Sequence, residues 1–482
     1  MFKMKTITHS LLALLLVMSF ASCASDNTCD LPIANDNSKV FLSVSINVAG
    51  EDSKTTRAED NTFDPNPNGG EHGNGDLKGE TYERTVDNMS MLFFHSDKGD
   101  LTDDEATIEK VIYFPNVSSD GKRTLAVEVD PKFLNDTKLR FLVVANVGDL
   151  SAYQGRKLSD VRDQLITDVF NRADNATGTT QGDLEGFSSF VMSSHGQSSL
   201  TIKSGSGTED DPYLIDHMIE RLAARIDIMP HTELYKPSKK TGLCKYCYNV
   251  KQGTDIIGGF VLEYVRPYNV LTSQEYVFKR TAADKTLANL MYLGLEESDE
   301  KKNSTNYVVD PTSQDKSKAT FKYPKITNEY WANATYEPFY QTRIAHKTHT
   351  NSTGGKATFN PETDYYILDY VKENTSFDND EQYATGLVFK GKYYEADDWD
   401  ATMVVPKTGH ESNGKDKAYT YVIRHSDPTG AGTTSDPMHY GIVRNNIYRV
   451  RIDGITGKGP DGLKVTLNVR KWATYTHEET TM

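Results

Sequence analysis

The end of the chain constrains the fold more than any other stretch, because its apolar residues follow a strict period. They occupy every second position over one run: Leu463, Val465, Leu467 and Val469. This period of two is typical of a β-strand with one buried face. Residues 457–462, just before the run, are rich in Gly, and residues 448–452 alternate in the same way. The sequence therefore predicts a C-terminal β-hairpin.

A second strand with the same period is predicted near the start of the chain. Its apolar positions are Val40, Leu42, Val44, Ile46 and Val48. The polar residues 49–62 follow, and they include Lys54 and Arg57. An exposed Arg in such a segment is where a trypsin-like protease would cut. We therefore predict cleavage between Arg57 and Ala58, with Lys54 as a competing site. The alternative is that Arg57 is a loop residue with no role in processing.

The first residues have the composition of a secretory signal. Two Lys residues precede an apolar run at residues 11–18, which is too short to span a membrane, and small residues then lead to Cys23. The junction Phe20-Ala21-Ser22-Cys23 is similar to a lipobox. We therefore predict a signal peptide over residues 1–22 and acylation of Cys23, for example with palmitate, which would hold the protein on a membrane. The alternative is an ordinary signal peptide followed by an incidental Cys.

The length of 482 residues suits two or three domains, and we predict two. Hydrophobic residues make up only 37%, and Tyr is frequent at 27 residues, which suits many strands with one wetted face. Strand signals recur at residues 86–95, 108–114, 123–129, 139–147, 187–193, 259–265, 365–371, 387–394 and 418–424. The sequence therefore predicts an all-β fold.

Three local patterns refine this fold. Residues 139–147 are nearly all apolar, which predicts a central strand covered on both faces. Apolar residues at helical spacing predict one minor helix over residues 159–169. Pro230 ends an alternating run, so we predict a domain boundary there, with an N-terminal domain over residues 58–230 and a C-terminal domain over residues 231–482.

No motif for catalysis, a cofactor or a metal stands out. The chain has no Gly-x-Ser-x-Gly, His-Glu-x-x-His or phosphate-loop motif, and its net charge of −15 argues against nucleic acid as a partner. Cys244 and Cys247 form one Cys-x-x-Cys pair. Structural zinc needs four ligands, so we expect a disulfide or two free thiols there and no metal. Abundant carboxylates leave a hydrolase with a glycosidase-like pair open, and Trp331 and Trp399 leave glycan binding open.

Several runs resemble the fimbrillins, the major fimbrial subunits of Bacteroidetes-type bacteria. Arg-Asn-Asn-Ile-Tyr at residues 444–448, the Gly-rich turn and the strand that leads to Trp472 are similar to the fimbrillin C-terminal segment. Residues 220–228, 370–375 and 385–391 also resemble fimbrillin strands. The resemblance implies two tandem transthyretin-like β-sandwich domains and a structural subunit that is not an enzyme. It also implies a homopolymer with other fimbrial subunits as partners.

The resemblance further implies a route of maturation and assembly. An Arg-specific protease would cut at Arg57 and remove the lipidated leader, residues 23–57, with its strand. The terminal strand of another subunit, over residues 463–469, would then fill the groove that the leader strand leaves in the first domain. The precursor is expected in the outer membrane after export through the periplasm, and the product in a cell-surface fimbrium that supports adhesion.

The apolar face of the terminal strand would be an exposed patch in a monomer, so we expect it to be free for donation. Two alternatives remain open beside a shaft subunit: a monomeric glycan-binding surface lipoprotein, and a fimbrial tip or anchor subunit. The sequence leaves the direction of donation and the adhesion target open.

Overall fold

The computed structural model describes residues 40–48, 83, 85–96, 103–117, 126–129, 139–164, 166–172, 187–194, 206–229, 246–282, 290–292, 307–313, 319–322, 349–350, 356–357, 366–375, 380–425 and 439–471. Cys23, Arg57, Ala58 and Trp331 lie outside the described residues. Within them strands dominate, and α4, Leu158–Gln164, is the one α-helix described over its full length. The predicted all-β class with a minor helix is confirmed. No helix in these ranges is long and apolar enough to cross a membrane.

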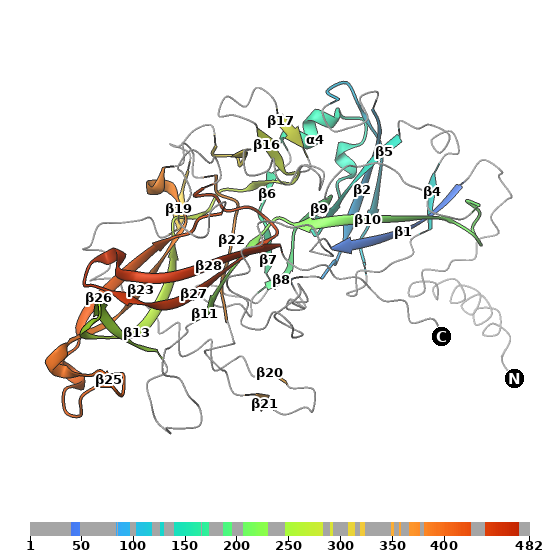
Figure 1. Cartoon of the computed structure of the whole chain (residues 1–482). Coiled ribbons are helices and arrows are strands. Elements are labelled where there is room, and N and C mark those ends of the chain that lie inside the picture. Colours follow the sequence, from blue (N-terminus) through green and yellow to red (C-terminus); the bar gives the residue numbers. More distant parts are fainter. Residues whose placement is uncertain are drawn as a thin grey trace, which may run out of the picture.

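Seven described strands form the first large sheet, on the right in Figure 1, in the order β3-β2-β5-β9-β10-β1-β4. Their bounds are β1 Val40–Val48, β2 Met89–His95, β3 Ile108–Phe114, β4 Ala126–Val129, β5 Leu139–Ala145, β9 Met192–Ser194 and β10 Tyr213–Arg221. The strand predicted over residues 40–48 is therefore present, and it is a member of this sheet.

β5 is buried on both faces, as its nearly continuous apolar sequence predicts. Phe141 and Val143 belong to one hydrophobic core, and Leu142 and Val144 belong to another on the opposite face of the sheet. Leu158 of α4 helps to form the second core. Alternate side chains of one strand thus stabilise two cores.

The helix is shorter than predicted. α4 ends at Gln164, and the chain then forms β6, Ile166–Thr167, which pairs with β15, Glu275–Tyr276. Val169, which was expected in the helix, is instead buried in the core that holds Phe141. Pairing with a strand that is distant in sequence therefore overrides the local helical period, as tertiary context often does.

Eight described strands form the second large sheet, in the order β22-β11-β27-β12-β13-β23-β26, with β28 paired to β27. Their bounds are β11 Ala224–Met229, β12 Cys247–Gln252, β13 Asp255–Tyr268, β22 Tyr366–Val371, β23 Gly386–Glu395, β26 Lys415–Val422, β27 Asn446–Thr456 and β28 Leu463–Lys471. β27 and β28, drawn in red in Figure 1, form the predicted C-terminal hairpin.

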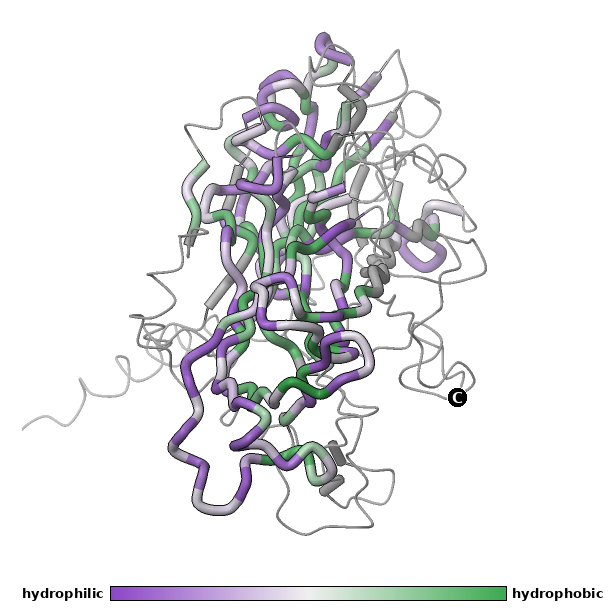
Figure 2. The backbone as a smooth tube through the Cα atoms, turned by 60° about the vertical axis from the view of Figure 1, so that its left-hand side comes forward, coloured by the Kyte–Doolittle hydropathy of each residue, from purple (hydrophilic) through white to green (hydrophobic). Residues whose placement is uncertain are grey.

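Short ladders and turns complete the described part. The ladders join β7 Phe170–Arg172 to β8 Phe187–Phe190, β14 Val270–Leu271 to β19 Phe321–Lys322, β16 Arg280–Ala282 to β17 Leu290–Tyr292 and β18 Tyr307–Val308, β20 His349–Thr350 to β21 Lys356–Ala357, and β24 Trp399–Asp400 to β25 Val405–Pro406. The 3₁₀ turns are η3 Ser151–Tyr153, η8 Glu381–Tyr383, η9 Ala396–Asp398, η10 Glu411–Asn413 and η11 Pro460–Gly462. In Figure 2 the hydrophobic stretches run through the body of the molecule, and many hydrophilic stretches lie along its outer loops.

The chain passes from the first sheet to the second through one nearly continuous run, β10 and β11. Only Leu222 and Ala223 separate these strands, and both residues are buried. β11 is already a member of the second sheet. The chain therefore enters the second sheet at β11, before the boundary predicted near Pro230. It does so without a long loop, because β10 and β11 follow each other almost directly.

Candidate functional site

β1 lies inside the first sheet with a partner strand on each side. It runs parallel to β10, where Leu42 lies opposite Tyr213, and antiparallel to β4, where Leu42 lies opposite Val127. Leu42 is fully buried in the core. Removing β1 would therefore leave unpaired backbone groups on β10 and on β4, and a gap in the core. That β1 is removed stays a prediction.

The β10 strand beside β1 carries a buried histidine. His217 is the register partner of Ile46, and its ring lies 4.6 Å from the ring of Phe141, measured between centroids. Its Nε2 atom lies 2.8 Å from Ser194 Oγ, so the buried ring has a hydrogen-bond partner. β10 therefore buries polar side chains, His217 and Arg221, beside the apolar Ile219.

Among the described strands, β28 pairs with β27 alone. Leu463 and Leu467 are 9% and 4% exposed and belong to the core of the second sheet. The expectation that this apolar face is exposed in a monomer is therefore wrong. The hairpin register sets Leu467 opposite Val450, which is itself fully buried, so both side chains share the inner face. Donation of β28 to another subunit stays a prediction.

A buried network of charges lies where the two sheets meet. Asp227 of β11 accepts hydrogen bonds from Arg225 Nε and Nη2 at 2.8 and 2.9 Å, and from Arg449 Nη2 at 3.3 Å. Arg225 also donates to the Glu83 carboxylate at 3.1 Å, which accepts from the Tyr370 hydroxyl as well. None of these side chains is more than 3% exposed. Such a network stabilises the fold only while each charge keeps its partner.

The Arg-Asn-Asn run that resembles the fimbrillins belongs to the same region. Arg444 is 1% exposed, and its guanidinium donates to the carbonyls of Val277 and Tyr276 at 2.9 and 2.7 Å and to Glu373 Oε2 at 2.7 Å. Asn445 accepts from Arg221 of β10 at 3.2 Å. The motif therefore anchors the start of β27 to the end of β10.

Sequence reasoning missed this junction. Alternation along β11 assigns Arg225 and Asp227 to the polar face, which is usually wetted. The available signal was the pair itself, because residues two apart on a strand point to the same face and here carry opposite charges. Two opposite charges on one face of a strand between apolar neighbours could have suggested a buried ion pair.

Two residues that the sequence offered for binding chemistry belong to a small core beside β12. Cys247 is 3% exposed and disulfide-bonded, so the free-thiol alternative is wrong for this residue. Trp399 is 3% exposed and donates from Nε1 to Asn249 at 2.7 Å, so its ring is not available to stack on a sugar. Across the described ranges, no group of His, Cys, Asp and Glu side chains is arranged to hold a metal ion.

A family model matches the C-terminal part of the chain. Residues 413–468, which include β26, β27 and most of β28, match the model described as major fimbrial subunit protein type IV, fimbrillin, C-terminal. This match confirms the resemblance to the fimbrillins. It supports a structural subunit of a cell-surface fimbrium, associated with other fimbrial subunits, over an enzyme. No curated protein matches the chain.

Several solved structures are similar over most of the chain at low identity. The tip fimbrial protein Mfa3 from Porphyromonas gingivalis, with a C-terminal truncation, is 13% identical with a TM-score of 0.36, over 90% of this chain and 100% of that chain. A fimbrilin, FimA, from the same organism is 15% identical with a TM-score of 0.37, over 90% and 98%. A fimbrial assembly protein from Parabacteroides distasonis is 10% identical with a TM-score of 0.33, over 89% and 99%. These TM-scores are too low to carry an argument.

Proposed function

We propose that this chain, whose residues 413–468 carry a fimbrillin C-terminal segment, is a fimbrial subunit that polymerises by strand exchange and supports adhesion. The observation that supports this most directly is the contrast between β1 and β28. Each strand has nine residues and alternating apolar positions, but β1 is paired on both sides and β28 on one side among the described strands. β1 would thus leave a strand-shaped gap, and β28 can leave its sheet by breaking one ladder.

The energetics favour exchange only after β1 has left. Leu463 and Leu467 are already buried in their own sheet, so only side chains that become more buried in the gap would add to the balance, by up to about 1.5–3 kcal/mol each. A strand between β10 and β4 also forms a ladder on each side, whereas β28 in its own sheet forms one ladder with the described strands. While β1 occupies its place between β10 and β4, another subunit's β28 cannot bind there. Assembly therefore waits for removal of the leader.

The leader has two roles in this proposal. Acylation of Cys23 holds the precursor in the outer membrane after export through the periplasm. An Arg-specific protease then cuts at Arg57, which releases the mature subunit, residues 58–482, from both the lipid and β1. The subunit enters the shaft of a fimbrium, where it both donates β28 and accepts another copy's strand.

Fixing β28 to β27 should block polymerisation without unfolding the chain. Arg451 and Thr466 are half-buried cross-strand neighbours, so Arg451→Cys/Thr466→Cys places two thiols where a disulfide can join the strands. After trypsin removes the leader, the oxidised variant should stay monomeric on size-exclusion chromatography. Reductant should restore polymers, because it frees β28.

A matched pair in the same sheet is the control for this experiment. Lys392→Cys/Asp416→Cys joins β23 to β26 at neighbouring positions and leaves β28 free. This variant should polymerise whether it is oxidised or reduced. Polymers from the oxidised Arg451→Cys/Thr466→Cys chain would show that β28 stays in its own sheet and would exclude it as the donor.

The maturation step makes a separate prediction. Limited trypsin treatment should give a stable product that begins at Ala58, because residues 49–62 have little apolar surface to bury. The variant Arg57→Ala should move the cut to Lys54, so that the product begins at Thr55. N-terminal sequencing of both products checks this. A wild-type product that begins at any other residue would count against Arg57 as the processing site.

A further inference from the structure

Residues 275–278 form a strap that packs on the first sheet. The first half of the strap is β15, which pairs with β6. Its second half, Val277 and Phe278, is fully buried in the core that holds Leu142. Ser193 of β9 also donates from its hydroxyl to the Val277 carbonyl at 2.6 Å. The strap therefore ties a segment that follows β13 of the second sheet to the first sheet.

The strap begins with a buried carboxyl group that makes no hydrogen bond. Glu275 is fully buried, and neither of its side-chain oxygens has a hydrogen-bond partner in the part of the chain that the structure describes. Arg444 Nη2 lies 4.0 Å from Glu275 Oε2, which is too far for a hydrogen bond. An ionised carboxylate in such a place is costly, and a neutral acid costs much less.

The cations near this carboxyl have already used the protons that they could donate. Both Nη2 protons of Arg444 are used, by the Tyr276 carbonyl and by Glu373 Oε2, each at 2.7 Å. Glu373 thereby balances the Arg444 charge. The three Nζ protons of Lys372 go to Asp168 at 2.9 Å and to two backbone carbonyls at 2.7 and 3.2 Å. The buried carboxyl therefore receives no proton from either cation.

The other charged groups around the strap do not favour an ionised carboxyl. Asp310 is buried and already accepts hydrogen bonds on both of its oxygens. Glu220 of β10 adds a further buried carboxyl group on the side of the first sheet. Beside α4, Arg162 and Arg280 both pair with Asp163. An ionised strap carboxyl would therefore face more negative than positive charge that is still unbalanced.

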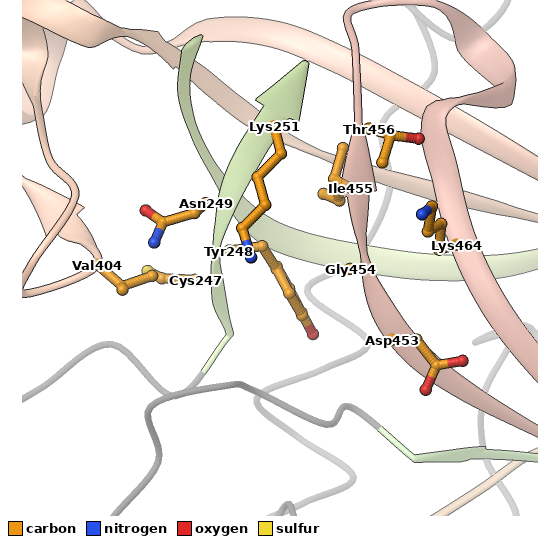
Figure 3. Close-up of a pocket in the computed structure, with 10 residues that line it drawn as sticks. All are labelled: Cys247, Tyr248, Asn249, Lys251, Val404, Asp453, Gly454, Ile455, Thr456 and Lys464. Carbon is orange, nitrogen blue, oxygen red and sulfur yellow. The ribbon is translucent and has the colours of Figure 1, made fainter. Parts of the chain in front are cut away.

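A buried polar group responds to pH only if its ordinary pKa lies within reach. Tyr248, on the wall of the cavity in Figure 3, also has a buried hydroxyl without a partner, but burial raises its pKa further above neutral pH. Burial, and next the Glu373 carboxylate, raise the pKa of Glu275 well above its usual value of about 4.3. Above about pH 4.3 the folded chain thus keeps a proton that the unfolded chain has lost, so stability falls as the pH rises.

We propose that Glu275 is a proton-dependent latch, whose neutral acid keeps the strap on the first sheet and whose ionisation releases it. An ionised carboxylate needs water, and water reaches it only if residues 275–278 move. Val277 and Phe278 would then leave the core of the first sheet, and Arg444 would lose its two carbonyl partners on the strap. The latch is independent of strand exchange, because neither β1 nor β28 takes part in it.

Thermal unfolding of the uncleaved chain between pH 5 and pH 8 tests the latch. Glu275→Gln is neutral at every pH, so its melting temperature should be close to that of the wild type at pH 5 and about 3 °C or more higher at pH 8. Glu373→Gln is the control and should melt below the wild type at pH 8, because it takes away the carboxylate that balances Arg444. A Glu275→Gln chain that melts below the wild type at pH 8, or a difference that does not change with pH, would overturn the proposal.

A second measurement follows the strap itself and does not depend on the Glu275→Gln chain. Val277→Cys is alkylated with iodoacetamide at pH 6 and pH 8, and peptide mapping separates this thiol from the natural cysteines. Its rate, relative to that of the unfolded chain at the same pH, should rise about tenfold or more over this range. Val143→Cys on β5 is equally buried and is the matched control. At pH 8 it should react at least about tenfold more slowly, because it opens only with the whole sheet. Equal rates at the two positions, or no rise at Val277→Cys, would show that the strap does not open and would overturn the latch.

Discussion

The variant Asp227→Ala is expected to lose about 3–5 kcal/mol of folding stability, because it breaks a buried ion-pair network. Asp227 is fully buried and accepts hydrogen bonds from both Arg225 and Arg449. Without its carboxylate, two guanidinium groups stay out of water with one counter-charge fewer. Urea denaturation of the full chain, followed by tryptophan fluorescence, measures the loss.

An exposed ion pair in the same sheet is the control. Asp416 pairs with Lys392 at 2.6 Å, but the two side chains are 55% and 35% exposed. Asp416→Ala should therefore cost about 1 kcal/mol or less, since water replaces the lost partner. If the two variants lost the same stability, burial would not be what makes the Asp227 network important.

The position of this network bears on the proposed polymer. The gap left by β1 would lie beside β10 in the first sheet, and β28 would be donated from the second sheet. Tension between neighbouring subunits would then pass through β10 and β11, with only Leu222 and Ala223 between them. Glu83 and Arg225 join the chain segment before β2 to β11 at this crossing. A rigid junction would keep a pull on β28 from separating the two sheets.

Alternation in the sequence was enough to find the strands on which the proposal depends. β1 and β28 follow the predicted runs closely, because each has one inner face and a period of two is a local property. β5 was predicted as a central strand because both of its faces are apolar. These properties depend on a few neighbouring residues, so one sequence suffices to predict them.

Alternation does not say what covers the second face of a strand. Arg225 and Arg449 occupy polar positions of their strands, yet both are buried because the chain around Glu83 and Asp227 supplies their partners. The apolar face of β28 was likewise predicted correctly. What packs against it was not, because Leu467 lies in the core of the strand's own sheet. Partners that are distant in sequence decide these points, and one sequence does not reveal them.

A chain that ends after Gly462 is expected to lose stability in the second sheet, because Leu463 and Leu467 belong to its core. Leu467→Asp should have a similar effect, since it replaces a buried leucine by a carboxylate without a partner, and about 3–5 kcal/mol is a fair expectation. Lys464→Asp, on the exposed face of the same strand, should change stability by about 0.5 kcal/mol or less. Thermal unfolding of the uncleaved chains measures all three.

The outcome decides how β28 can act as a donor. If the shortened chain and Leu467→Asp both melt well below the wild type, β28 is part of its own domain before assembly, and donation must first break the ladder with β27. If the shortened chain has the melting temperature of the wild type, Leu463 and Leu467 contribute little to the stability of their own sheet. The strand could then leave that sheet at a small cost in free energy. In the first case a loss of polymers in Leu467→Asp does not identify the donor, because an unstable subunit also fails to assemble. Only a folded chain with β28 fixed to β27 separates the two causes.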